Sequence, residues 1–150
     1  MERCMSLILV VFALVLSGFA DKIAVNDCGS VNGKVTEVRV TGCTEADKQC
    51  ILKRNTNATI EIDFEANKDA DELKVVVHGI IMDIHTPFPM PNPDACKDSG
   101  VECPIVTGNK YAFSTTLPIL KAYPRVSVDI QFELKSDEDY VCVLIPAKLH

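Results

Sequence analysis

The chain has 150 residues, and 15 Lys and Arg stand against 21 Asp and Glu, so its formal net charge is -6 at pH 7. This acidic balance argues against nucleic-acid binding, which normally needs a basic face. Charged residues make up 24% of the chain and hydrophobic residues 47%. This composition predicts one globular domain rather than a disordered segment.

The first residues have the features of a secretory signal peptide. Arg3 precedes the apolar run 7–16, and Gly18 and Ala20 supply small residues for cleavage. The apolar run is too short for a membrane anchor, because crossing the hydrocarbon layer takes about 20 residues. We therefore predict that residues 1–20 are a signal peptide and that residues 21–150 form the mature, secreted domain.

Removal of the signal peptide also removes Cys4 and leaves six cysteines, an even number that is typical of disulfides in a secreted domain. The pairs Cys43–Cys50 and Cys96–Cys103 each enclose a short, polar, turn-like loop, so we expect them to bond locally. The remaining pair, Cys28–Cys142, then joins the two ends of the mature domain. We predict three disulfides and neither a thiol nucleophile nor a thiolate metal site.

Apolar and polar residues alternate along several segments of the mature domain, which is the period of a half-buried β-strand. The alternation is clearest in 57–65 and 125–135, and no segment has the apolar stripe of an amphipathic helix. The pattern predicts an all-β, immunoglobulin-like sandwich of two antiparallel sheets, built from about seven strands. Weaker alternation marks five further predicted strands at 34–40, 73–78, 80–84, 111–119 and 140–145.

Residue patterns for catalysis or metal binding are sparse. The sequence has no H-E-x-x-H, G-x-S-x-G or phosphate-binding Gly motif, and its three histidines are too scattered to indicate a zinc site. Segment 63–72 is acidic but lacks the ligand spacing of a calcium loop. Glu61, Asp63 and Glu65 share the polar face of one predicted strand, where a solvated surface is favoured over a glycosidase pair. We predict a protein that is not an enzyme and has no catalytic residues, no metal and no cofactor.

The sequence contains one glycosylation sequon, Asn57-Ala58-Thr59. Asn57 lies on the polar side of its predicted strand, where a glycan would project outward. We therefore predict that Asn57 is glycosylated.

Four prolines occupy alternate positions between His85 and Cys96. Such a run cannot pair in a central strand and favours polyproline geometry. It would form a stiff rim that carries Phe88 and Met90. Composition alone fits both an apolar lip over an opening and a rigid connection with a buried Phe88. The prolines are Pro87, Pro89, Pro91 and Pro93.

Together with the six cysteines, a series of short motifs resembles the Niemann-Pick type C2 family of secreted sterol carriers, within the ML (MD-2-related lipid-recognition) superfamily. The resemblance covers essentially the whole mature domain. It implies a sandwich whose sheets leave an internal apolar cavity for a cholesterol-like sterol, and it implies the same three disulfides. The motifs are, in order, Asp27-Cys28-Gly29-Ser30, Val77-His78-Gly79, Pro87-Phe88-Pro89, Pro93-Asp94-Ala95-Cys96, Cys103-Pro104-Ile105, Leu117-Pro118-Ile119, Tyr123-Pro124 and Ile145-Pro146.

The resemblance also implies a sterol site, whereas the alternating pattern alone favours an ordinary filled core. Vertebrate members of the family commonly carry Trp at the positions of Phe132 and Val143, so the inner wall here is less bulky. The implied site has Phe88 on the rim, Ile119 and Tyr123 at the opposite lip, and Val40, Ile60, Phe113, Pro124, Val128 and Ile130 inside.

Family membership further implies a monomer that contacts membranes transiently and has a Niemann-Pick type C membrane sterol transporter as a partner. We expect the protein to be extracellular or delivered to the lysosome lumen. The charge of -6 disfavours anionic bilayers at pH 7, and the approach to neutrality near pH 5 favours docking. Two alternatives remain: a carrier or recognition module for other lipids (fatty acids, semiochemicals or microbial lipids), and an adhesion sandwich with a filled core.

Overall fold

The computed structural model describes residues 22–150, so the predicted signal peptide lies outside the described residues. The described part of the chain is built from nine β-strands, and within it no helix is long and apolar enough to cross a membrane. The strands are β1 (Asn26–Asp27), β2 (Gly33–Val40), β3 (Cys50–Leu52), β4 (Thr56–Ala66), β5 (Lys74–Ile81), β6 (Ile84–Phe88), β7 (Lys110–Ile119), β8 (Ser127–Lys135) and β9 (Asp139–Leu149).

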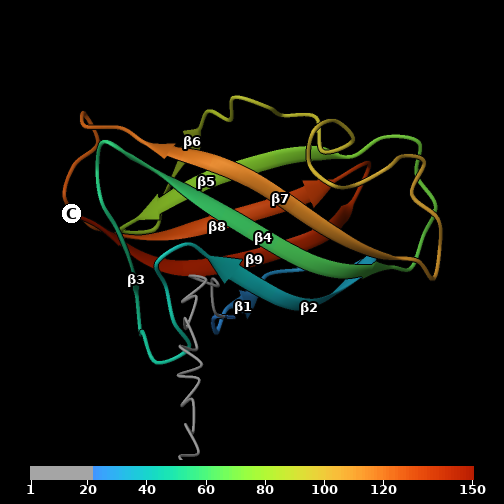
Figure 1. The fold of residues 1–150 in the computed structure, drawn as a ribbon, viewed down its shortest axis with the longest axis horizontal. Helices are drawn as coiled ribbons and strands as arrows, with labels where there is room; N and C mark the ends of the chain where they lie inside the picture. The colour runs from blue at the N-terminus through green and yellow to red at the C-terminus, as the bar shows by residue number, and fades with distance from the viewer. Residues whose placement is uncertain (1–21) are drawn as a thin grey trace, which may run out of the picture.

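The strands form two packed sheets, as the crossing ribbons of Figure 1 show. The large sheet has the order β1-β9-β8-β5-β6, and the short strand β3 pairs in parallel with the end of β9. The small sheet has the order β2-β4-β7, and its strands are antiparallel. The predicted all-β, two-sheet sandwich is confirmed.

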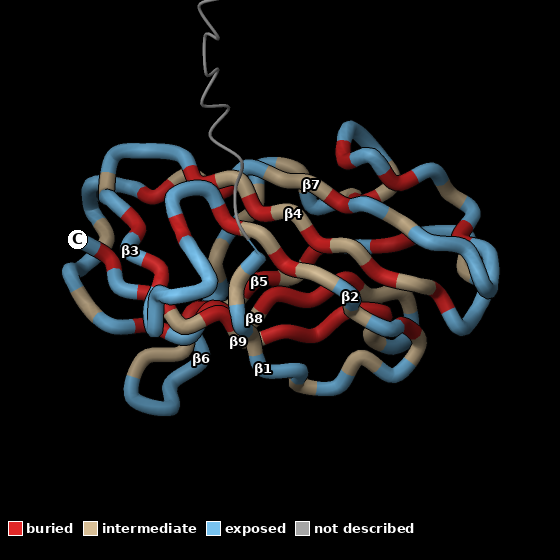
Figure 2. Tube along the Cα trace, turned by 60° about the horizontal axis from the view of Figure 1, so that its bottom comes forward, coloured by how far each residue is buried: buried red, intermediate tan, exposed pale blue. Residues whose placement is uncertain are grey.

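The core lies between the two sheets and follows the alternation in the sequence. Along β4, residues from Ala58 to Ala66 alternate between buried and partly exposed positions (Figure 2). Phe113 of β7 and Phe132 of β8 meet between the sheets, and their ring centroids are 5.8 Å apart. Because burying one large apolar side chain contributes about 1.5–3 kcal/mol, these inward faces supply the main force that holds the sheets together.

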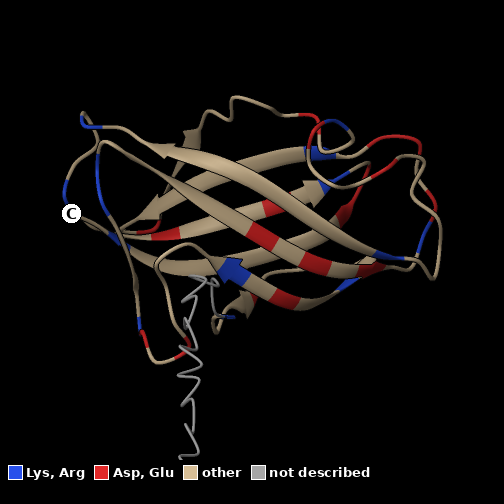
Figure 3. Cartoon of the chain, viewed as in Figure 1, with Lys and Arg blue, Asp and Glu red and all other residues tan. Residues whose placement is uncertain are grey.

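The outer face of the small sheet is acidic, as predicted for the alternate carboxylates of β4 (Figure 3). Arg39 of β2 lies among these carboxylates. Its Nε is 2.8 Å from Glu61 and its Nη1 is 2.9 Å from Asp63. Hydrogen bonds to Asp63 and Glu61 raise the pKa of Arg39. These carboxylates therefore form a partly neutralised surface.

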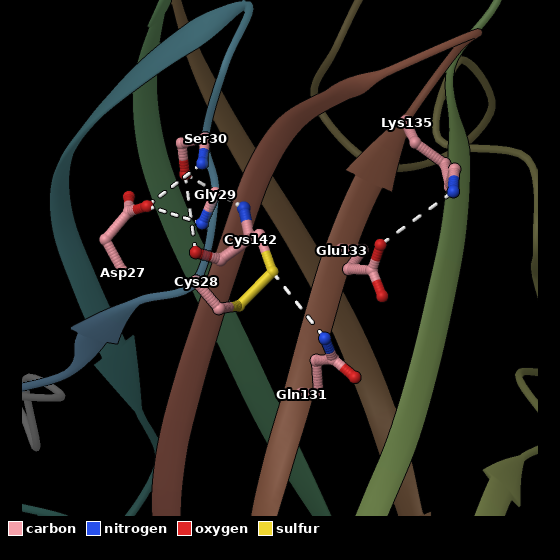
Figure 4. Close-up of a disulfide and its surroundings, with 8 residues drawn as sticks. All are labelled: Asp27, Cys28, Gly29, Ser30, Gln131, Glu133, Lys135 and Cys142. Atoms are coloured by element: carbon pink, nitrogen blue, oxygen red, sulfur yellow. Dashed lines mark hydrogen bonds and ion pairs between the residues drawn. A yellow bond between two sulfur atoms is a disulfide. The ribbon is translucent and has the colours of Figure 1, made fainter. Parts of the chain in front are cut away.

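All three predicted disulfides are present: Cys28–Cys142, Cys43–Cys50 and Cys96–Cys103. Figure 4 shows how the first of them ties the segment before β2 to β9. The backbone N–H of Cys142 donates to Ser30 Oγ at 2.9 Å, and Asp27 accepts from the N–H groups of Gly29 and Ser30. Partial burial of Asp27 raises its pKa, but the hydrogen bonds together lower the pKa by more, so the net pKa is below its ordinary value.

One strand prediction needs correction. The segment 80–84 is not a strand, because Met82 and Asp83 form a two-residue turn between β5 and β6 with φ angles of 50° and 64°. Such positive angles match the twist of a tight hairpin. The proline run begins inside a strand at the edge of the sheet, since Pro87 lies in β6 opposite His78. β6 is an edge strand, where a residue without an N–H is tolerated.

Asn57 is exposed near the start of β4, so the sequon is accessible. Its glycosylation stays a prediction.

Candidate functional site

The two predicted lips meet at one end of the sandwich. Phe88, the last residue of β6, packs against Tyr123 in the turn between β7 and β8. Their ring centroids are 4.9 Å apart and their planes are inclined at 58°. Both side chains are partly buried, and burial raises the pKa of Tyr123. We call the end of the sandwich that carries this aromatic contact the rim end.

Arg54 fixes the turn that carries Tyr123. Its Nη1 donates to the carbonyl of Lys121 at 2.8 Å and to that of Tyr123 at 3.2 Å. The backbone N–H of Asn55 donates to the carbonyl of Ile119 at 2.5 Å. No sequence motif pointed to Arg54, because its contacts join segments that are distant along the chain.

Six of the predicted sterol-site residues point between the sheets. They come from both walls of the sandwich, and Val40 is paired directly with Ile60 across β2 and β4. Each is between 1% and 7% exposed. Gly79 of β5 allows this packing, because a Cβ there would lie 3.3 Å from Val128 Cγ2. The six residues are Val40, Ile60, Phe113, Ile119, Val128 and Ile130.

Side chains from both sheets meet in this space, where the ring centroids of Phe113 and Phe132 are 5.8 Å apart. Among the cavities at the surface of the described chain, five have volumes of about 290 to 550 Å³. None of the five is lined by Val40, Ile60, Phe113, Val128 or Ile130. A lipid in the middle of this space would have to displace the Phe113–Phe132 contact, and the internal cavity stays a prediction.

Pro124 does not lie where the family resemblance placed it. It was expected inside the sandwich, but it is exposed in the turn after Tyr123. The two hydrogen bonds from Arg54 hold the backbone of this turn at the surface. By contrast, Phe132 and Val143 are paired across β8 and β9 and are fully buried in the inner wall.

One group of three potential metal-ligating side chains occurs within residues 22–150: Glu133, Asp139 and Cys142. The Cys142 sulfur is bonded to Cys28, so two carboxylates remain. Burial, together with a hydrogen bond to Glu133, raises the pKa of Asp139 to about 6. This pair lies near the disulfide, and nothing links it to the predicted lipid site.

Apolar and basic side chains gather at the rim end. Met82 is 90% exposed and Ile84 67% exposed at the β5–β6 turn, and Leu120 is 47% exposed after β7. Figure 3 shows Lys and Arg residues at the same end, near the C-terminus. The basic residues in the segments that meet there are Lys53, Arg54, Lys121, Arg125 and Lys148. Asp83 of the β5–β6 turn and Asp129 of β8 lie at this end as well, so the five basic residues stand beside acidic ones.

Comparison with known proteins places the chain among lipid-recognition proteins. Residues 22–149 match the family model described as the ML domain. The chain is 52% identical over 125 residues to the "Ecdysteroid-regulated 16 kDa protein" of Manduca sexta. This match covers 83% of this chain and 86% of the Manduca protein. It is 44% identical over 142 residues to the "NPC intracellular cholesterol transporter 2 homolog a" of Drosophila melanogaster. This match covers 93% of this chain and 96% of the Drosophila protein.

A solved structure shares the fold. The crystal structure of a Niemann-Pick type C2 protein from the Japanese carpenter ant matches with a TM-score of 0.80 and 29% sequence identity. The match covers 85% of this chain and 100% of the ant chain. The chain therefore belongs to the Niemann-Pick type C2 family of ML-domain proteins.

Proposed function

We propose that this protein is a secreted sterol carrier, which buries a cholesterol-like lipid between its two sheets and transfers it to membranes. Proteins of the ML family bind lipids and are not enzymes. The observation that carries the proposal is the Phe88–Tyr123 contact, which closes one end of an apolar interior contributed by both sheets. Relatives from Drosophila melanogaster and Bos taurus carry the name of cholesterol transporters.

The energy of binding would come from apolar burial. A sterol exposes a few hundred Å² of apolar surface, and at about 25 cal/mol per Å² its burial gives several kcal/mol. Separating the Phe113–Phe132 contact would cost part of this energy. The affinity then depends on how few further side chains and segments binding must order. The three disulfides limit that ordering cost. The sterol hydroxyl would lie at the rim end near Tyr123, where water can satisfy it.

Phe88→Ala and Tyr123→Ala should each weaken sterol binding about tenfold, which corresponds to about 1.4 kcal/mol of lost contact. Both side chains are only partly buried, so the free energy of unfolding should change little. Competition with a fluorescent sterol at pH 5 and pH 7 measures the affinity. Tyr111→Ala is the matched control, because Tyr111 is also partly buried and stacks on Phe64 away from the rim end. Unchanged affinity in both rim variants would contradict this site.

The bound lipid of the secreted protein decides between ligand classes. Mass spectrometry should find a sterol that the fluorescent sterol displaces. Fatty acids or other lipids, with no competition by sterol, would instead support a carrier or recognition module for those lipids. A protein that purifies without lipid and binds neither class would be an adhesion sandwich with a filled core.

We further propose that the rim end docks on anionic membranes during transfer. Exposed Met82 and Ile84 flank Asp83 and can insert among the lipid head groups, and the basic residues at the same end of the sandwich attract anionic lipid. Ile84→Asp should slow sterol transfer to anionic vesicles, and transfer by the unchanged protein should be faster at pH 5 than at pH 7. Val31→Asp is the control, because Val31 is 66% exposed and follows the Cys28–Cys142 disulfide outside the rim end. Equal slowing by both variants would contradict docking by this end.

We also propose where the carrier acts and which membrane protein receives the sterol. Three disulfides favour an oxidising compartment, so we place the carrier outside the cell or in the lysosome lumen, with a Niemann-Pick type C membrane sterol transporter as acceptor. Fractionation of cells that express the tagged chain measures the location. Retention in the cytosol, with reduced cysteines, would contradict it.

A further inference from the structure

Two histidines that looked scattered in the sequence are neighbours on the outer face of the large sheet. The tight turn at Met82–Asp83 pairs Ile80 with His85, and it pairs His78 with Pro87. His78 and His85 therefore occupy diagonal positions on one face of the hairpin. Their ring centroids are 6.1 Å apart, and their planes are inclined at 69°.

Both imidazoles have nitrogen atoms to spare. His85 is exposed, so its imidazole is accessible from solvent. The Nδ1 atom of His78 is buried, and it lacks a hydrogen-bond partner in the described part of the chain. A buried polar atom without a partner is costly, so this nitrogen would gain from a ligand.

We propose that His78 and His85 form a two-histidine site for a divalent transition-metal ion such as Zn²⁺. Imidazole nitrogen is a preferred ligand for such ions. A Zn–N bond of about 2.0–2.1 Å places the ion about 3.2 Å from each ring centroid, so two rings on one ion can be up to about 6.4 Å apart. The observed separation of 6.1 Å lies within this limit, and rotation of His85 can bring the rings to a bent arrangement. Water would fill the remaining coordination positions.

The surroundings favour a cation and limit competing ligands. Asp129 of β8 is paired with Ile80 and lies on the same outer face, so it adds negative charge beside the histidines. All six cysteines of the described chain are in disulfides and offer no thiolate. The ion would clamp the edge strand β6 to β5. This inference does not rest on the proposed lipid function.

The test is calorimetric titration of the oxidised protein with ZnCl₂ at pH 7.5. We expect one ion per chain. His78→Gln and His85→Gln should each weaken binding at least about tenfold, the scale of loss when even an outer-shell partner is removed. His150→Gln is the matched control, because it removes the third histidine of the sequence and should leave the affinity unchanged.

A second readout separates metal binding from a change in fold. Zn²⁺ should shift the ring resonances of His78 and His85 in NMR spectra and leave those of His150 in place. The proposal is overturned if the protein binds no Zn²⁺ at millimolar concentration. Binding that survives in His78→Gln or His85→Gln, or that is lost in His150→Gln, overturns it equally.

Discussion

Replacing Cys28 and Cys142 together by alanine should lower the free energy of unfolding by about 4–5 kcal/mol in the chain-entropy account. The bond joins residues separated by 114 positions, so its loss frees nearly the whole domain in the unfolded state. It also holds the segment before β2 against β9, where Cys28 N–H donates to the Cys142 carbonyl at 2.8 Å. Equilibrium denaturation in guanidinium measures the loss. Both cysteines are replaced so that no free thiol remains to exchange.

The control is the double alanine variant of Cys43 and Cys50. This pair has a sequence separation of 7, and closing such a short loop is worth only about 2.5 kcal/mol in the same account. We therefore expect a clearly smaller loss of stability than for the long-range pair. Equal losses in the two variants would show that local packing, rather than the length of the closed loop, sets the stabilisation.

The regular strands were predictable because each has one buried face. In β4 and β8 every second residue enters the core, and this period of two appears directly in the sequence. The boundaries differ by a residue or two for most strands. The strands β1 and β3 were not predicted, because two or three residues cannot display an alternation.

The hairpin turn at Met82–Asp83 was missed for a different reason. Tight turns with positive φ angles are usually marked by Gly or Asn, and here Met82 and Asp83 adopt these angles. The run from Ile80 to Ile84 therefore looked like one strand. The same error concealed the approach of His78 and His85, which depends on the exact length of this turn.

The candidate site was predictable only in part. The alternation placed Ile60, Val128 and Ile130 correctly inward, and their burial confirms that orientation. The pattern does not distinguish a lipid-lined wall from a filled core, because both need apolar residues at these positions. The family resemblance implied that Phe88 and Tyr123 lie on opposite lips of the site, and their rings are in contact in the structure. No local pattern could indicate the hydrogen bonds that hold the turn of Tyr123 in place.

Phe132→Ala should lower the free energy of unfolding by about 3–5 kcal/mol, because a fully buried ring is removed from the middle of the core. Phe132 touches Phe113 of the opposite sheet, so its loss leaves a void between the sheets. Denaturation in guanidinium measures the change. Phe64→Ala is the matched control, because Phe64 is about as buried as Phe132. It is stacked on Tyr111 toward the end of β4 that lies away from the rim end.

The same variant tests whether the sterol takes the place of core packing. In the unchanged protein, a sterol between the sheets must first displace the Phe113–Phe132 contact, and that cost lowers the observed affinity. Phe132→Ala has already lost the contact, so saturating sterol should raise its melting temperature more than that of the unchanged protein. Phe64→Ala should show the shift of the unchanged protein, since its void lies away from the rim end. Equal shifts in all three proteins would place the sterol outside the space that Phe132 occupies, and the interior would then be a core rather than a binding site.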